Sequence, residues 1–418
     1  MQRIGNLIIG FLFLIYGGVT AQAQDYQKAV EEVYRSQSVR GVFGRFEAEI
    51  PAIKTAWKEM SRLYSPSGNE VLRARYIVAK YKSYGIENAH IDTHGNAVGL
   101  VEGRSEGPSI AFFGTMDDLA TVAEMVKTWD KPIEERGGRL IGPGTNSSAT
   151  CATLLGVARL FTLDEVSFSG RVYFVGLVQE ETGLTGIKGF LDDHPGEIDY
   201  VVDIMSGIGS ISYGAIGIHW FKIHFKGNRG HTLSGGLPNV TRAVAQAVDR
   251  IFDLRVPTSP PEKRSHLNIS MLGAGSVYNH KHDDGWFSVD LRSMDNDVLN
   301  GLKQKIFGIA EEVAAVHGFE HWVEQYSEVP AGQIPGARNS RLVRIAEEVT
   351  ILLGSGVSLS NSGSSNMNVG IARRIPSIST GGSRGSGRDT PDEYANIEPN
   401  LTGIKLNFLI GYIITHMK

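Results

Sequence analysis

The chain has 418 residues, with 41 lysines and arginines against 45 aspartates and glutamates, which gives a formal charge of −4. This length allows two or three domains of ordinary size. The balanced charge excludes the basic surface that nucleic-acid-binding proteins carry, so no nucleic-acid partner is expected. A single cysteine, Cys151, excludes an internal disulfide. Because Cys151 lies in an apolar helical run, a buried structural thiol is favoured over a nucleophile.

The first residues have the pattern of a secretory signal peptide. Arg3 supplies a positive start, residues 7–15 form an apolar run, and Ala21-Gln22-Ala23 is a small-x-small cleavage site. We predict a signal peptide at residues 1–23, cleavage after Ala23, and a periplasmic or secreted protein with no membrane association after cleavage. An uncleaved membrane anchor is the alternative, which the short apolar run disfavours.

Strands and helices alternate through most of the mature chain. Such alternation predicts an α/β domain with a mostly parallel central sheet flanked by helices, built from residues 24–216 and 329–418. Its predicted strands are 89–92, 97–101, 109–114, 172–178 and 200–203, and its predicted helices are 27–35, 49–63, 71–84, 149–160 and 187–191.

The pattern changes between residues 217 and 328. Predicted strands at 219–225, 266–272 and 286–291 and helices at 240–252 and 302–317 give a β-α-β-β-α-β order. We therefore predict a separate α+β domain inserted into the α/β domain. From residue 340 the alternation resumes, and 408–414 is expected to belong to a packed C-terminal helix.

Polar residues follow the predicted parallel strands. Glu180 and Glu181 come directly after the strand at 172–178, at the edge where open α/β sheets bind their ligands. Adjacent carboxylates need a cation, a proton or hydrogen bonds to compensate them, and one can act as a general base while its neighbour holds a metal. The alternative is a solvated pair in a loop. Other polar residues at predicted strand ends are Thr115, Asp117, Asn146, Ser147, Asp203 and Asp389.

With these motifs in order, the mature chain resembles the co-catalytic zinc peptidases and amidohydrolases, which include aminoacylase, peptidase T and glutamate carboxypeptidase. The resemblance implies two zinc ions held by two histidines and three carboxylates, and a glutamate as general base. It also implies an inserted domain that covers the site and mediates dimerisation. The matching segments are Ser65-Pro66-Ser67-Gly68, Phe113-Gly114-Thr115-Met116-Asp117, Gly142-Pro143-Gly144, Glu180-Glu181-Thr182-Gly183, Gly230-His231-Thr232, Gly275-Ser276-Val277-Tyr278-Asn279, Val289-Asp290-Leu291-Arg292 and Thr390-Pro391-Asp392-Glu393-Tyr394.

Three ligand positions depart from the family pattern. Thr115 stands where the family has its first histidine, Ser147 where it has the bridging aspartate, and Asp389 where it has the last histidine. Both histidines are therefore missing, and the repulsion between two dications loses its bridging carboxylate, so a two-zinc centre is not expected.

The remaining family positions are retained. Glu181 and Asp203 persist as ligand types, Glu180 persists in the position of the general base, and Asp117, which orients the first histidine in the family, also persists. Glu180 and Asp117 are therefore the predicted catalytic residues. Glu181, Asp203 and Asp389 form an all-oxygen set that suits calcium, magnesium or manganese. One weakly held divalent cation and no metal at all both remain open, and Asp389 can instead pair with an arginine of its own loop.

Three residues of the inserted domain match family positions that contact the substrate or the developing oxyanion. These are His231, Asn279 and Arg292, which carry donors suited to a carboxylate and a polarised carbonyl. The alternative is structural: Arg292 anchors its strand pair and His231 caps a turn.

Three functions remain open from the sequence. The first is an exported hydrolase of amide or peptide bonds in small acylated amino acids or peptides, with Glu180 as base. The second is a metal-independent enzyme of changed reaction type, such as proton abstraction and elimination. The third is a non-catalytic binding protein on the same fold. A homodimer through the inserted domain is expected in each case.

Overall fold

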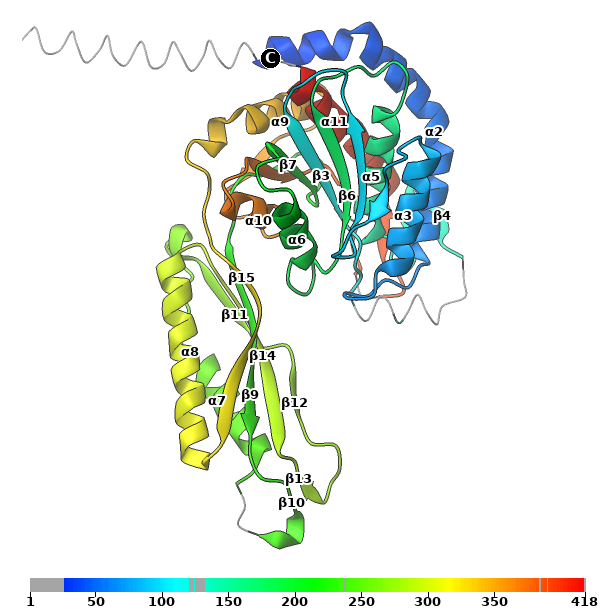
Figure 1. Ribbon diagram of the computed structural model, residues 1–418. Coiled ribbons are helices and arrows are strands. Elements are labelled where there is room, and N and C mark those ends of the chain that lie inside the picture. The colour runs from blue at the N-terminus through cyan, green and yellow to red at the C-terminus, as the bar shows by residue number, and fades with distance from the viewer. Residues whose placement is uncertain are drawn as a thin grey trace, which may run out of the picture.

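The computed structural model describes residues 26–119, 124, 132–235, 238–382, 385–388 and 390–416. The predicted signal peptide and Asp389 lie outside these residues. An α/β domain forms one end of the molecule, and an elongated sheet-and-helix domain projects from it (Figure 1).

The α/β domain is built on an eight-stranded sheet in the order β1-β2-β6-β3-β7-β17-β8-β16. Its central strands β6, β3, β7 and β17 run parallel, which confirms the predicted fold class. The strand bounds are β1 His90–Ile91, β2 Ala97–Glu102, β3 Ser109–Thr115, β6 Arg171–Leu177, β7 Tyr200–Ile204, β8 Ser210–Ser212, β16 Ser358–Ser360 and β17 Ser377–Thr380.

Helices cover both faces of this sheet, so its central strands are almost completely buried. Every residue of β3 is buried, with Phe112 in the core on one face and Phe113 in the core on the other. The first face packs against α2 Gln37–Ser61, α3 Val71–Ser83, α5 Ser148–Phe161, α9 Arg341–Leu352 and α11 Ile397–His416, and the second against α6 Thr185–Asp193 and α10 Met367–Ala372.

Helix α2 is longer than predicted. The sequence predicts a helix from residue 49, but α2 begins at Gln37 and continues through Pro51. Val39, Val42 and Phe46 are fully buried upstream of the proline. Their burial outweighs the cost of about 3 kcal/mol that an interior proline carries.

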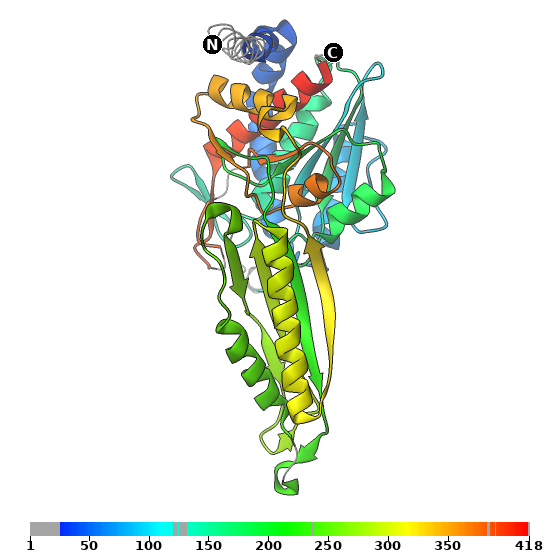
Figure 2. The same cartoon turned by 90° about the vertical axis from the view of Figure 1, so that its left-hand side faces the viewer.

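The second domain is a five-stranded antiparallel sheet covered on one face by two helices (Figure 2). Phe221, Ile223 and Phe225 of β9 pack into the helices, so the alternate residues of this strand belong to the opposite face. The predicted single strand at 266–272 is wrong, because two short strands pair separately with β14. The bounds are β9 Gly217–Lys226, β11 Ser265–Asn268, β12 Leu272–Ala274, β14 Asp284–Ser293, β15 Glu320–Val329, α7 Val240–Phe252 and α8 Asn296–His317.

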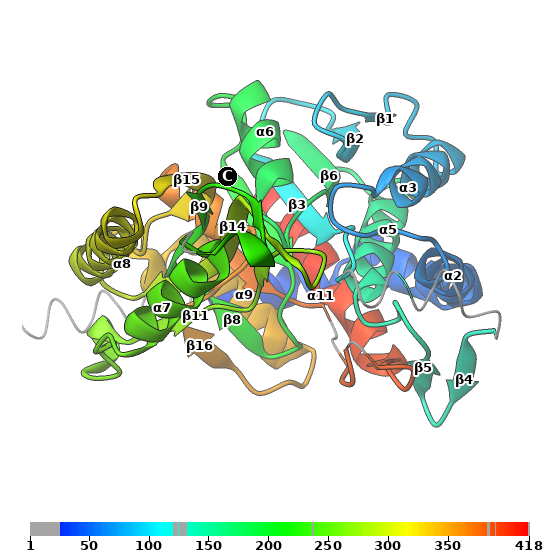
Figure 3. The same ribbon diagram turned by 90° about the horizontal axis from the view of Figure 1, so that it is seen from below.

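Two smaller sheets complete the fold. Strands β10 Gly230–His231 and β13 His280–Lys281 pair at the tip of the second domain, remote from the α/β domain (Figure 1). Strands β4 Glu134–Arg136, β5 Arg139–Ile141 and β18 Tyr394–Asn396 form a sheet that the sequence did not predict, on the side of the α/β domain away from α7 and α8 (Figure 3). Short 3-10 helices occupy Thr232–Ser234, Pro261–Lys263 and Ala337–Asn339.

The C-terminal helix α11 is almost entirely buried, as expected from its apolar residues 408–414. Within the described residues, no helix combines the length and apolar character that a bilayer crossing requires.

Candidate functional site

The carboxyl ends of β3, β6 and β7 meet beside a cavity of about 270 Å³. Residues from both domains line it, including Glu180 and Glu181 after β6, Arg292 on β14, and Arg388 in the loop after β17. Among the described residues, no histidine lines this cavity. The structure therefore brings Glu180, Glu181 and Arg292 together, although their domains are separate in the sequence.

The loop that carries the two glutamates has an unusual backbone. Gln179 and Leu184, which flank it, have φ angles of 53° and 57°, in the left-handed region that non-glycine residues rarely adopt. Each such residue costs about 1–2 kcal/mol. Backbone strain of this kind clusters at binding and catalytic sites, where surrounding contacts hold it in place.

Buried carboxylates hold this loop through three consecutive backbone N–H groups. Glu70 Oε1 accepts from the N–H of Gln179 at 2.9 Å. Asp117 Oδ1 accepts from the N–H of Glu180 at 3.0 Å, and its Oδ2 accepts from the N–H of Glu181 at 2.9 Å. The loop geometry therefore depends on acids that lie behind it.

Asp117 is fully buried and does not line the cavity. Besides the two amides, it accepts the hydroxyl of Ser67 at 2.5 Å. Burial raises the pKa of Asp117 to about 7, although these hydrogen bonds lower it. Asp117, predicted from the sequence to be catalytic, holds the backbone of Glu180 and Glu181 in this geometry.

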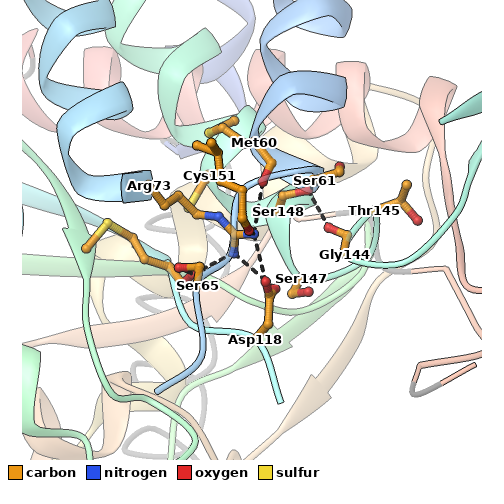
Figure 4. Close-up of polar contacts among 12 residues, drawn as sticks. Met60, Ser61, Ser65, Arg73, Asp118, Gly144, Thr145, Ser147, Ser148 and Cys151 are labelled. Carbon is orange, nitrogen blue, oxygen red and sulfur yellow. Dashed lines mark hydrogen bonds and ion pairs between the residues drawn. The ribbon is translucent and has the colours of Figure 1, made fainter. Parts of the chain in front are cut away.

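The segment after β3 is fixed by a buried ion pair (Figure 4). Arg73 and Asp118 are both inaccessible to solvent, and the guanidinium donates to both carboxylate oxygens, at 3.0 and 2.8 Å. The same guanidinium donates to the backbone carbonyls of Met116 and Met60. A charge pair of this kind has to be complete, since either partner alone would be a buried unpaired charge. It fixes the backbone on both sides of Asp117.

Arg388 supplies a positive charge to the cavity. Its guanidinium donates to Glu181 Oε1, and both side chains are partly buried. The negative charge of Glu181, followed by that of Glu180, raises the pKa of Arg388 against the opposing effect of burial. Glu181, predicted as a metal ligand, is thus paired with a protein cation.

Asn366 lies between Thr115 and Asp203, two of the positions singled out in the sequence. Its side-chain amide donates to Thr115 Oγ1 at 3.2 Å and to Asp203 Oδ1 at 3.5 Å. Asp203 Oδ2 also accepts from the N–H of Met367 at 3.3 Å. Thr115 and Asp203, two positions at which the family resemblance implies zinc ligands, are therefore hydrogen-bonded to protein donors.

These contacts test whether the residues fit the zinc pair that the family resemblance implies. Ser147 is the N-terminal cap of α5 and provides no carboxylate. In the described part of the chain, no group of three or more histidine, cysteine, aspartate or glutamate side chains is arranged to hold a metal ion. The donors at the described positions, which exclude Asp389, do not fit two zinc ions.

Glu393, another buried acid, joins the segment at residues 144–146 to the loop that precedes β18. Glu393 accepts from the backbone N–H of Gly144 at 3.1 Å and of Asn146 at 2.7 Å. Burial raises the pKa of Glu393 to about 7 despite these bonds. The glycine turn at 142–144, singled out in the sequence, is therefore a structural element held by Glu393.

His231 and Asn279 do not reach the cavity of their own chain. They lie at the β10–β13 tip, where the Asn279 amide lies 3.3 Å from His231 Nε2, and the tip is remote from the α/β domain (Figure 1). His231 also caps the following 3-10 helix by accepting from the N–H of Leu233. Within one chain, the structural interpretation of His231 applies.

The sequence did not predict several cavity residues. Arg388 was considered only as a partner for Asp389, and its pairing with Glu181 joins loops that are 207 residues apart. Trp220 was not singled out, whereas the serine-rich run 360–365, which contains Ser364 and Ser365, is expected from the sequence to be a loop that closes over the site. For Trp220, the signal in the sequence is the alternation of apolar and polar residues along β9, which places Trp220 on the face of the sheet away from the helices.

Cys151 is buried, as predicted. Burial raises the pKa of its thiol to about 12, and its Sγ contacts the carbonyl oxygen of Thr115 at 3.0 Å. A thiol in this state is a packing group and does not act as a nucleophile.

Comparisons with known proteins identify relatives of the chain. The model of "Peptidase family M20/M25/M40" matches residues 112–408. The N-acetyl-L-cysteine deacetylase of Bacillus subtilis (strain 168) is 26% identical over 249 residues, which cover 55% of this chain and 56% of that protein. A putative LysW-lysine/LysW-ornithine hydrolase of Pyrococcus abyssi is 32% identical over 157 residues, covering 38% and 41%. The chain thus spans about half the length of the curated relatives it matches.

Solved structures share the fold. The aminopeptidase PepT from Bacillus cereus aligns with a TM-score of 0.64 at 19% identity, covering 87% of this chain and 98% of that one. Human carnosine dipeptidase 1 aligns with a TM-score of 0.69 at 13% identity, covering 90% and 98%. At these identities the likeness concerns the fold alone.

The raised pKa of Glu393 predicts a pH-dependent stability. A carboxyl group whose pKa is higher in the folded than in the unfolded protein stabilises the fold fully at low pH, and this contribution is lost as the pH rises from about 4 to about 7. The unfolding free energy should therefore fall less steeply between pH 5 and pH 8 in Glu393→Gln than in the wild type, and the two slopes should differ by the equivalent of about one bound proton. Urea denaturation at several pH values measures these slopes. The exposed neighbour Asp392 is the matched control, since Asp392→Asn should leave the slope unchanged. An equal slope in wild type and Glu393→Gln would contradict the assignment.

Proposed function

Since this chain belongs to the peptidase family M20/M25/M40, we propose that it is an exported hydrolase of amide or peptide bonds in small acylated amino acids or peptides. We further propose that the metal-ligand positions of this site are altered, and that side chains of the protein carry out the reaction. The names of two relatives, an N-acetyl-L-cysteine deacetylase and a putative LysW-lysine/LysW-ornithine hydrolase, support this substrate class.

One observation carries the proposal: Glu180, Arg292 and Arg388 line the same interdomain cavity. A carboxylate can accept a proton from water, and guanidinium groups stabilise negative charge that develops on a carbonyl oxygen. A base and two cations therefore surround one space large enough for a small molecule.

The chemistry follows from these groups. Glu180 removes a proton from a water molecule, whose oxygen forms a bond to the carbonyl carbon of the substrate amide. The carbonyl oxygen takes up the negative charge, and a guanidinium of the cavity stabilises it. Glu180 then returns the proton to the amide nitrogen, the carbon–nitrogen bond breaks, and an acid and an amine leave.

The orientation of Arg292 suits a substrate carboxylate. Asp290 accepts from its Nε at 2.9 Å and from its Nη2 at 3.0 Å, which fixes the guanidinium plane. Its Nη1 donates to the hydroxyl of Ser364 at 2.6 Å. Beside it, the buried hydroxyl of Ser365 lines the cavity and has no hydrogen-bond partner among the described residues. These groups offer a bound carboxylate both charge and hydrogen bonds.

A binding protein without catalysis is the second candidate. The specific observation that favours it is the pairing of Glu181 with Arg388, together with the Asn366 contacts to Thr115 and Asp203. Through these contacts, the positions at which the family resemblance implies metal ligands are hydrogen-bonded or ion-paired within the protein. An enzyme of changed reaction type, using Glu180 for proton abstraction, would need the same cavity and the same base.

The Glu180→Gln variant tests the hydrolase directly. It removes the proton acceptor but keeps the shape, so turnover of a panel of N-acyl amino acids and dipeptides should fall by more than about 100-fold while the protein stays folded. Exposed Glu320 provides the control variant, and Glu320→Gln should keep full turnover.

Two other outcomes are informative. Undiminished turnover in Glu180→Gln would exclude this residue as the base. Binding of panel members by the wild type, without turnover of any of them, would favour the binding protein.

Dimerisation and export complete the proposal. His231 and Asn279 lie too far from the cavity of their own chain to serve it, so we propose that residues 217–328 mediate a homodimer in which this tip approaches the cavity of the second copy. Protein purified from its native producer should begin at Gln24 by mass spectrometry and have the mass of two chains by light scattering. An intact N-terminus would contradict export with signal cleavage. The mass of one chain at micromolar concentration would contradict the homodimer.

A further inference from the structure

The cavity described above continues onto the uncovered face of the five-stranded sheet. A second cavity of about 410 Å³ shares Glu181, Trp220 and Arg292 with it. Trp220, Met271 and Tyr326 give this second cavity an apolar and aromatic part, and charged side chains, Lys222 and Asp290 among them, line the rest. Both volumes fall at or near the lower end of the range typical of small-molecule sites.

Trp220 stands at the junction of the two cavities in a fixed orientation. Its indole N–H donates to Asp290 Oδ1 at 2.7 Å. The guanidinium of Arg292 lies over its ring at 5.5 Å from the centroid, within the range of a cation–π contact. The same carboxylate therefore orients both the arginine and the indole.

Tyr326 is held at the other side by a bulge in β15. The pairing of β15 with β9 shifts between Gln325 and Ser327, so Tyr326 is the extra residue of the bulge. Its hydroxyl donates to Glu324 at 2.8 Å and accepts from Lys222 at 2.9 Å. Bulges re-aim side chains beside active sites, and these bonds fix the ring although 39% of the residue is exposed.

The bulge also touches the loop of the two glutamates. A Cβ on Gly183 would lie 3.2 Å from the carbonyl oxygen of Tyr326, a tight contact, and the φ angle of 149° at Gly183 also favours glycine. The aromatic cavity is thereby joined directly to the loop that carries Glu180 and Glu181.

We infer that the second cavity is the subsite for an aromatic group on the substrate, such as an aroyl group on the nitrogen of an amino acid. This inference rests on the proposed function. The amide would lie beside Glu180, Arg292 would stand at the junction, and the ring would pack between Trp220 and Tyr326. Two rigid aromatic side chains beside a site, here half-buried Trp220 and exposed Tyr326, bind such a ring at little cost in conformational entropy.

Binding measurements separate this inference from the hydrolysis. Calorimetric titration of the Glu180→Gln variant with N-benzoyl and N-acetyl forms of glycine, leucine, glutamate and lysine compares the two acyl groups on the same amino acid. We expect about tenfold tighter binding of the benzoyl form. Adding Trp220→Leu or Tyr326→Ala should bring this ratio down to about threefold or less.

Trp322 offers a matched control on the same strand as Tyr326. It is 43% exposed, stacks on His224 at 4.7 Å between centroids, and does not line either cavity. Trp322→Leu should leave the benzoyl-to-acetyl ratio unchanged. Equal affinities for the two forms, or a ratio that Trp322→Leu lowers as much as Tyr326→Ala does, would overturn the inference.

The remaining outcomes are also decisive. Preference for benzoyl derivatives without turnover by the wild type would keep the subsite and refute the hydrolase. Variants of Trp220 and Tyr326 that change the mass in light scattering but not the ratio would show an interface between copies and overturn the subsite. Failure of every derivative to bind would refute both proposals.

Discussion

The constraint on which the site depends is the crowding of acids at one edge of the sheet. Glu70, Asp117, Glu180 and Glu181 lie close together, and water reaches the first two hardly at all. Unpaired carboxylates in such a place are costly. Nearby groups compensate these negative charges. Glu70 and Asp117 accept hydrogen bonds from the three consecutive backbone N–H groups of residues 179–181, and Arg388 pairs with Glu181. These bonds also set the strained loop that presents Glu180 to the cavity.

The general position of this site could be predicted from the sequence, because parallel strands bring their carboxyl ends to one edge. Glu180 and Glu181 were found in this way, and Arg292 through the family resemblance. The pairing of Arg388 with Glu181 and the position of Asn366 could not be predicted. Both depend on loops far apart in the chain, and neither has a periodic pattern. The position of the tip that carries His231 could not be predicted either, since a motif does not give the orientation of its domain.

The fold shows the same limits. Long elements with a clear pattern, such as α7 and β9, were predicted nearly to the residue, whereas α2 continues through Pro51 because tertiary burial overrides a local preference. The small sheet of β4, β5 and β18 was missed, because its strands are only three residues long and pair across the chain. Yet β18 follows Glu393 directly, so this sheet helps to hold the glycine turn at the site.

The chain therefore has the fold of its peptidase family with a changed charge balance at the strand ends. Protein donors satisfy Thr115, Asp203 and Glu181, positions at which the family resemblance implies zinc ligands. Native mass spectrometry of the mature protein, titrated with zinc, measures this most directly. The account predicts the mass of the polypeptide alone, with no stoichiometric zinc at micromolar concentrations of the ion. One or two zinc ions retained per chain would contradict it.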